Sequence, residues 1–138
     1  MKLVFADTFY WIALADYTDN SHQQALALTA ELASCKIITT DEVLTEYLNF
    51  FSDSIEPSRR QVMQSVRGIL GSFLITVAPQ SRQSFLTACD LYEGRADKGY
   101  SLTDCISMQT MRREGVTDAL TNDRHFEQEG FRALFRVS

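Results

Sequence analysis

Leu3-Val4-Phe5-Ala6-Asp7-Thr8, near the start of the chain, joins four apolar residues to an aspartate and a threonine. A run this short and apolar is typical of a central parallel strand that helices cover on both faces. Asp7 then stands at the carboxyl end of the strand, the edge where open α/β sheets bind their ligands. The stretch therefore predicts a covered sheet and a candidate site at its edge.

Other short apolar or β-branched runs predict the remaining strands, at 36–39, 73–77, 119–121 and 133–137. Apolar residues at helical spacing between these runs predict helices at 21–34, 43–51, 57–70, 80–93 and 101–114. Parallel strands that alternate with helices need crossover connections. We therefore expect an α/β fold, a three-layer α/β/α sandwich around a mainly parallel sheet of four to five strands.

Length and charge narrow the function classes. The 138 residues, 45% of them apolar, are expected to form a single domain over residues 1–138. The formal charge of −5 argues against a protein that binds nucleic acid through massed basic residues, but not against an enzyme whose acids surround a metal ion. Arg59-Arg60 is predicted to be a solvated helix face, and Arg124 is the better candidate for a phosphate contact.

The sequence lacks the patterns that are typical of several classes of protein. The longest apolar run near the N-terminus, 9–15, has seven residues and no basic preface, so a cytoplasmic protein without membrane contact is expected. The three cysteines are widely spaced and predict neither a disulfide framework nor a zinc site. The six glycines form no phosphate-binding loop, and no nucleophile elbow is present.

Four acids stand where the predicted strands give way to helices. Asp7 and Asp123 directly follow strands, Glu46 lies one turn into a helix, and Asp104 lies in the first turn of another. We expect the four carboxylates to converge on one edge of the sheet. Crowded carboxylates repel one another unless a hard cation such as Mg²⁺ or Mn²⁺ lies between them, so this pattern favours a metal site.

The same acids also fit a structural interpretation. The first and the last of them occupy positions where an aspartate caps a helix. Thr39 with Glu42, and Ser101 with Asp104, both match the spacing of a capping box. His125 is interpreted as structural, since it stands beside Phe126 at a helix start. Spacing alone leaves the metal site and the helix caps both open.

The motifs around these acids resemble those of PIN-domain ribonucleases, in the same order and over nearly the whole chain. In that family a strand delivers an Asp followed by Ser or Thr, and a Glu, an Asp and a further Asp follow within helical or strand-end motifs. The matching segments are Phe5-Ala6-Asp7-Thr8, Thr45-Glu46, Ser101-Leu102-Thr103-Asp104-Cys105-Ile106-Ser107 and Leu120-Thr121-Asn122-Asp123-Arg124-His125-Phe126.

The resemblance implies a role for each residue. Asp7 and Asp104 would be the principal Mg²⁺ or Mn²⁺ ligands, and Glu46 and Asp123 would complete the acidic pocket. Neighbouring hydroxyl groups would orient these carboxylates or a bound water: Thr8, Thr103 and Thr121. The metal would generate hydroxide and neutralise charge on the scissile phosphate.

Among PIN proteins the chain is most similar to VapC-type toxins of toxin–antitoxin pairs. That similarity implies an endoribonuclease that leaves 5′-phosphate and 3′-hydroxyl ends. It also implies a small antitoxin protein as partner, and a homodimer. A PIN-type RNA-processing protein without toxicity and a non-catalytic binding module are the alternatives within the same fold.

A receiver-type or phosphatase-type protein with Asp7 as phosphoacceptor is a further alternative. A receiver normally carries an acidic pair at the first strand, and the run 5–8 has a single acid. A haloacid-type phosphatase has Asp-x-Asp, and Phe9 stands at the second position here. The sequence therefore favours the metal-dependent ribonuclease.

Overall fold

The computed structural model describes residues 1–137, and its five strands form one sheet in which every pairing is parallel. The predicted α/β fold is confirmed. The elements are, in chain order, β1 (Leu3–Ala6), α1 (Thr8–Ala15), α2 (His22–Glu31), β2 (Lys36–Thr40), α3 (Asp41–Phe50), α4 (Arg59–Gly71), β3 (Ile75–Ala78), α5 (Arg82–Gly94), α6 (Leu102–Glu114), β4 (Asp118–Leu120), α7 (Arg124–Gln128), β5 (Arg132–Ala133) and the 3₁₀ helix η1 (Leu134–Arg136).

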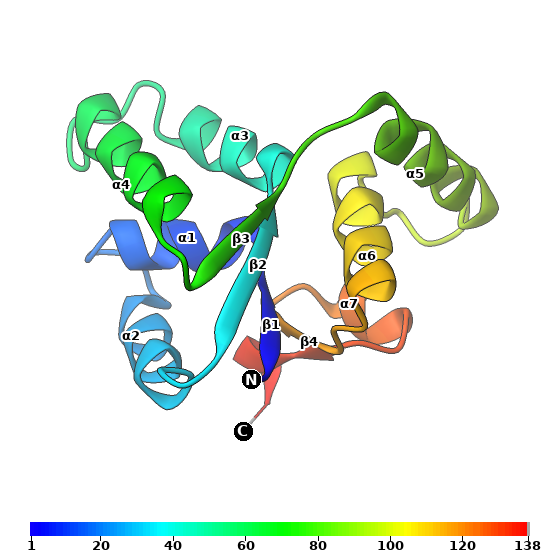
Figure 1. The fold of residues 1–138 in the computed structure, drawn as a ribbon. Coiled ribbons are helices and arrows are strands. Elements are labelled where there is room, and N and C mark those ends of the chain that lie inside the picture. Colours follow the sequence, from blue (N-terminus) through cyan, green and yellow to red (C-terminus); the bar gives the residue numbers. More distant parts are fainter. Residues whose placement is uncertain (138) are drawn as a thin grey trace.

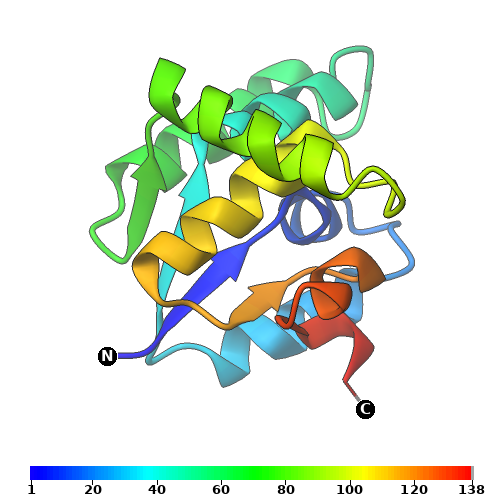
Figure 2. The same cartoon turned by 90° about the vertical axis from the view of Figure 1, so that its right-hand side faces the viewer.

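Helices cover the sheet on both sides, as the expected three layers require. Figure 1 shows α1, α2 and α4 on one side of the strands and α5 and α6 on the other. Figure 2 shows α6 next to the sheet, with α5 packed against it on the outside. No helix within residues 1–137 has both the length and the apolar character that crossing a bilayer requires.

The opening stretch forms the centre of the molecule. The strand order β3-β2-β1-β4-β5 places β1 between β2 and β4, and Phe5 lies opposite Ile38 on one side and Ala119 on the other. Val4, Phe5 and Ala6 are fully buried. This order also differs from the 2-1-3-4-5 order of receiver-type proteins, which weakens the phosphoacceptor alternative.

The ends of some predicted elements were wrong. The strand predicted from residue 73 begins at Ile75, because Phe73 lies in the turn after α4 and is 92% exposed. The strand predicted over 133–137 is reduced to Arg132–Ala133. The amide of Phe135 donates to the carbonyl of Thr121 (3.2 Å), and this bond turns the chain into η1 instead of continuing the ladder.

One of the two predicted capping boxes forms, and the other does not. Ser101 and Asp104 form the predicted capping box of α6. The other predicted box, Thr39 with Glu42, is absent, because the Thr39 hydroxyl points inward and donates to the carbonyl of Ala6 (2.8 Å). Thr40 caps α3 instead, accepting the amide of Val43 (3.0 Å).

Candidate active site

The candidate site lies where the order of strands reverses. Successive strands β1, β2 and β3 build the sheet in one direction, and β4 and β5 build it in the other. The reversal between β1 and β4 opens a crevice at their carboxyl ends, where such sheets bind ligands. Asp7 directly follows β1, Thr121 directly follows β4, and Asp123 comes two residues later, so the crevice receives predicted site residues from both strands.

Asp7 occupies the N-cap position of α1 but forms no capping bond with its side chain. Its Oδ2 instead accepts a hydrogen bond from the Thr121 hydroxyl (2.7 Å), and the residue is only 8% exposed. Burial raises the pKa of the Asp7 carboxyl to about 7, against the lowering effect of the Thr121 bond. Repulsion from Asp104 and Glu46 acts in the same direction as burial.

Glu46 reaches the crevice from α3. The buried face of this helix carries Val43, Leu44 and Tyr47, and the half-buried Glu46 lies beside that face. The Thr8 hydroxyl donates to Glu46 Oε1 at 2.6 Å. One of the predicted hydroxyl neighbours therefore fixes the orientation of the second acid.

Asp104 sits in the first turn of α6 and serves as a cap there. Its amide donates to the Ser101 hydroxyl (3.0 Å), and its Oδ2 accepts the amide of Ser101 (3.2 Å). Burial is the largest cause that raises the pKa of Asp104, and repulsion from Asp123 and Glu46 adds to it. A cap alone does not explain the close approach of these other acids.

Asp123 caps α7, as predicted, and joins a small cluster with His125. Its Oδ1 accepts the amide of His125 (2.9 Å), and its own amide donates to the Thr121 hydroxyl (3.1 Å). Ligand atoms of Asp104, Asp123 and His125 all lie within 4.8 Å of one another. His125, interpreted from the sequence as structural, thus lies in the candidate site, two residues after the last acid.

The four carboxylates share one arrangement of their oxygens. In each, a hydrogen bond fixes one oxygen: Oδ2 of Asp7, Oε1 of Glu46, Oδ2 of Asp104 and Oδ1 of Asp123. Each acid is therefore oriented by a hydrogen bond from the protein.

A partly buried ionic network lies beside the histidine. The ring of Tyr100 lies 5.1 Å from that of His125, and its hydroxyl donates to Glu129 (2.9 Å). Arg95 and Arg112 also donate to Glu129, at 2.8 and 2.7 Å. Burial alone would raise the pKa of Glu129, but these three donors outweigh it and lower the pKa to about 2. Sequence reasoning missed this network.

The side chains of Thr103 and Arg124 form no hydrogen bond or ion pair with the four acids within the described residues. Within residues 1–137, no hydrogen bond joins the Thr103 side chain to any of the four carboxylates, and Thr103 lines a neighbouring groove of about 510 Å³ with Leu102 and Ile106. Arg124 begins α7, is exposed, and forms no ion pair with the described residues. The structure thus gathers the four acids with Thr8 and Thr121.

Known structures share this architecture. No family model and no curated protein matches the sequence. The crystal structure of the Mycobacterium tuberculosis toxin VapC20, described as cleaving the sarcin-ricin loop, matches with a TM-score of 0.80 and 25% identity over 93% of this chain and 95% of that one. DNA-bound VapBC from Salmonella typhimurium matches with a TM-score of 0.65 and 18% identity over 96% and 97%.

The fold, with acids at the reversal of the strand order, is that of a PIN-domain protein. Within this class the structural match is to VapC-like toxins, as the sequence motifs implied.

Proposed function

We propose that this chain is a divalent-metal-dependent endoribonuclease, the toxin of a toxin–antitoxin pair, acting as a single domain over residues 1–138. The observation that carries the proposal is the set of four carboxylates, each oriented by a hydrogen bond, at the strand reversal of a VapC-like fold. The similarity to a toxin described as cleaving an RNA loop supports RNA as the substrate.

The donor set fits a hard divalent cation. All four acids offer carboxylate oxygen, and Mg²⁺ and Mn²⁺ prefer such ligands. Burial chiefly, and repulsion from the other acids in addition, raise the pKa values of Asp7 and Asp104. A bound cation would offset both effects. We assign Asp7 and Asp104 as the principal ligands, with Glu46 and Asp123 completing the site. A bound ion would activate water and neutralise charge on the phosphate.

The other residues act on the carboxylates and on the substrate. The Thr8 and Thr121 hydroxyls hold Glu46 and Asp7 in the orientation that the hydrogen bonds define. Arg124 is free of protein carboxylates within the described chain and would bind a phosphate of the RNA. Thr103 would bind water or substrate from the adjacent groove.

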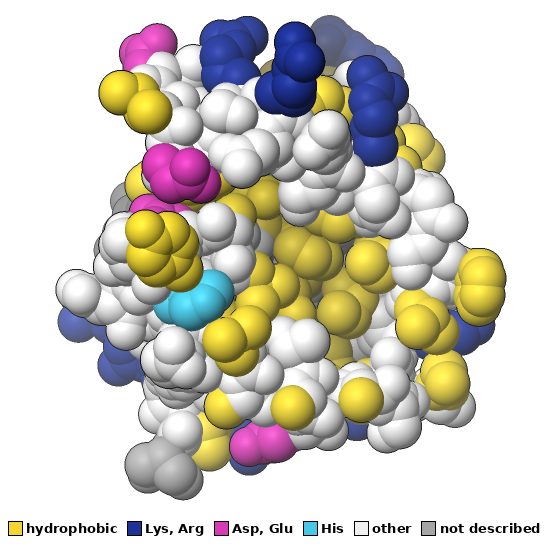
Figure 3. Space-filling view, turned by 90° about the vertical axis from the view of Figure 1, so that its left-hand side faces the viewer, with side chains coloured by type: hydrophobic (Ala, Val, Ile, Leu, Met, Phe, Trp, Pro, Cys, Tyr) yellow, Lys and Arg dark blue, Asp and Glu magenta, His cyan; other side chains and the backbone are white. Residues whose placement is uncertain are grey.

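Partner binding rests on exposed apolar surface as well as on the resemblance. Figure 3 shows a hollow with an apolar lining, and a cavity of about 240 Å³ lies there between α2 and β3, lined by Trp11, Leu32 and Leu74 among others. An apolar segment of an antitoxin would fit it. Phe51 is buried, whereas Phe50 is 56% exposed and would contact a second copy in a homodimer. We propose that the protein binds these partners in the cytoplasm.

The test is RNA cleavage by the purified protein, with Mg²⁺ or Mn²⁺ and with EDTA. Asp7→Asn and Asp104→Asn should abolish cleavage while the far-ultraviolet circular dichroism stays unchanged. Asp90→Asn removes an exposed carboxylate from α5 and should cleave like the wild type. Products should carry 5′-phosphates. Cleavage in EDTA with 2′,3′-cyclic phosphate ends would refute the metal mechanism.

A further inference from the structure

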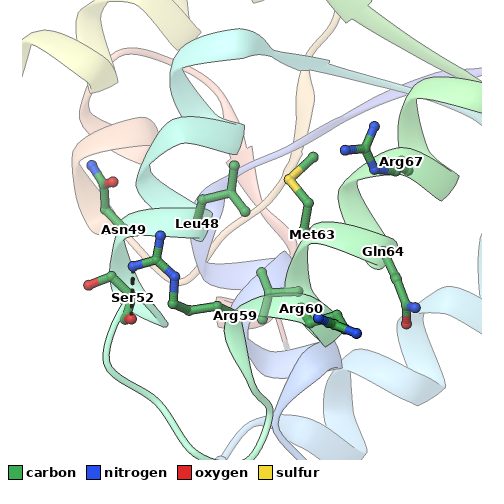
Figure 4. A pocket seen from close by; sticks show the side chains of 9 residues that line it. Leu48, Asn49, Ser52, Arg59, Arg60, Met63, Gln64 and Arg67 are labelled. Carbon is green, nitrogen blue, oxygen red and sulfur yellow. Dashed lines mark hydrogen bonds between the residues drawn. The ribbon is translucent and has the colours of Figure 1, made fainter.

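A basic groove of about 730 Å³ lies between α3 and α4, outside the candidate active site (Figure 4). One wall comes from α3 and the turn after it, and the other from α4. Its polar lining residues carry hydrogen-bond donors and no carboxylate, and its floor is apolar. The lining consists of Leu48, Asn49, Ser52, Arg59, Arg60, Val62, Met63, Gln64 and Arg67.

The positive charge of this groove is uncompensated. Arg59, Arg60 and Arg67 are exposed, and none of them forms an ion pair with any described residue. Five other arginines of the chain do form such pairs, including Arg95 and Arg112 with Glu129. Figure 3 shows Lys and Arg side chains along the upper rim of its face, where α4 lies. In a chain of net charge −5, this groove is therefore a local positive field.

The arginines are arranged along one helix face. Arg60, Gln64 and Arg67 follow one another at helical spacing. The backbone positions of Arg60 and Arg67 are about 10 Å apart along the helix axis. The Arg59 side chain crosses to the other wall and donates to the carbonyl of Ser52 (3.2 Å), as the dashed line in Figure 4 shows. The groove is thus preformed and elongated.

Helix α3 connects the groove to the candidate active site. Glu46 projects from this helix toward Thr8. Asn49 lies one turn later and lines the groove. Thr45, four residues before Asn49 on the same ridge of the helix, is exposed. A strand held at Glu46 therefore needs to cross only the exposed ridge of α3 to reach the arginines.

We infer that this groove binds the phosphate backbone of the RNA substrate a few nucleotides away from the scissile bond. The inference rests on the proposed function. Guanidinium groups bind phosphate bidentately, the amides of Asn49 and Gln64 donate further bonds, and Leu48 and Met63 offer an apolar surface to the sugars. An acidic peptide has the same sign of charge, but the connection to the active site through α3 favours the substrate.

The test compares two variants that lose three positive charges each. The groove variant carries Arg59→Gln, Arg60→Gln and Arg67→Gln. The control variant removes three exposed cations that form only surface ion pairs elsewhere: Lys98→Gln, Arg113→Gln and Arg136→Gln. Both reach the same net charge, so a difference between them reports the position of the charges.

Binding is measured in EDTA, which prevents cleavage, by fluorescence anisotropy of a labelled single-stranded RNA over a series of salt concentrations. The groove variant should bind at least about tenfold more weakly than the control, and the slope of log Kd against log salt should fall by about 2, which is roughly 0.7 for each lost phosphate contact. Equal binding by the two variants overturns the inference, as does failure of the wild type to bind RNA. Unchanged RNA binding with a loss of affinity for an acidic peptide also overturns it.

Cleavage separates the groove from the active site. In the presence of metal, kcat/KM of the groove variant should fall for long RNA and stay at the wild-type value for a dinucleotide, which is too short to reach α4. A wild type that cleaves RNA, beside a groove variant that cleaves long RNA equally well, refutes the groove but leaves the ribonuclease standing. A wild type that binds RNA through the groove without cleaving it in Mg²⁺ or Mn²⁺ refutes the enzyme and leaves the groove as an RNA-binding surface.

Discussion

Replacing Asp7 with asparagine should stabilise the metal-free protein at neutral and alkaline pH. Burial holds the pKa of this carboxyl near 7 in the fold, against 3.8 ordinarily. Because the folded pKa is the higher one, the stability linked to this group is fully present below pH 3.8 and is lost as the pH rises to about 7. Above that pH, ionised Asp7 lowers the free energy of unfolding by about 4 kcal/mol, at about 1.4 kcal/mol for each pKa unit.

Asparagine removes this penalty at nearly constant volume. Its Oδ1 can still accept the Thr121 hydroxyl that binds Asp7 now. Its amide nitrogen gains no partner and costs about 1–3 kcal/mol. The net advantage of Asp7→Asn over the wild type should therefore be absent or negative near pH 4, grow by up to about 1.4 kcal/mol per pH unit, and level off above pH 7.

Urea unfolding in EDTA across this pH range measures the difference directly, with Asp90→Asn as the control for loss of an exposed charge. A difference between Asp7→Asn and wild type that does not vary with pH would refute the assignment of a buried, strained carboxyl. Adding Mg²⁺ at about 100 times its dissociation constant should raise the stability of the wild type by about 2.7 kcal/mol and leave Asp7→Asn nearly unchanged.

Substitutions at two other positions test the helix cap of α6 and the ionic network. Asp104→Asn keeps an oxygen that accepts the Ser101 amide, so the metal-free variant should be as stable as wild type. The rise in Tm that metal causes should vanish in this variant. Asp104→Ala loses the cap and should lose about 0.5–2 kcal/mol of stability with or without metal. Glu129→Gln should lose up to about 3 kcal/mol at pH 7, because the pKa of this carboxyl is lowered from 4.5 to about 2. The wild type should lose the same contribution between pH 4.5 and 2, and a Glu129→Gln protein that unfolds in urea like wild type at pH 7 would contradict the network.

The central strand and the edge of the site could be predicted because both depend on local patterns. Leu3–Ala6 is apolar without interruption and forms the buried strand β1, so the residue after it had to stand at the sheet edge. The capping box of Ser101 with Asp104 depends on a spacing of three residues and was also predicted. The predicted bounds of the fifth strand were wrong because a bond from Phe135 to Thr121, formed only in the folded chain, bends the backbone there.

The ionic network and the basic groove depend on contacts between distant segments. Glu129 meets its partners across 17 to 34 residues of sequence, and no local pattern joins them. Arg59-Arg60 is exposed, as predicted, but only the packing of α4 beside α3 turns an exposed helix face into the wall of a groove. Sequence periodicity reports which face of a helix is buried, and it does not report what lies opposite the exposed one.

Helix ends position the acids of the site, but they do not account for Asp7. Asp104 and Asp123 stand at the N-termini of α6 and α7 and form capping bonds there. A helix N-terminus favours an ionised carboxylate by about 0.3–1 kcal/mol, and two useful caps would be a sufficient reason for those two residues. Asp7 forms no such bond and is buried at a cost of about 4 kcal/mol when ionised. A set of helix caps gives no reason to keep that carboxyl, whereas a cation shared with Asp104 would offset its cost. The burial of Asp7 is therefore the feature that favours a metal site over the structural interpretation.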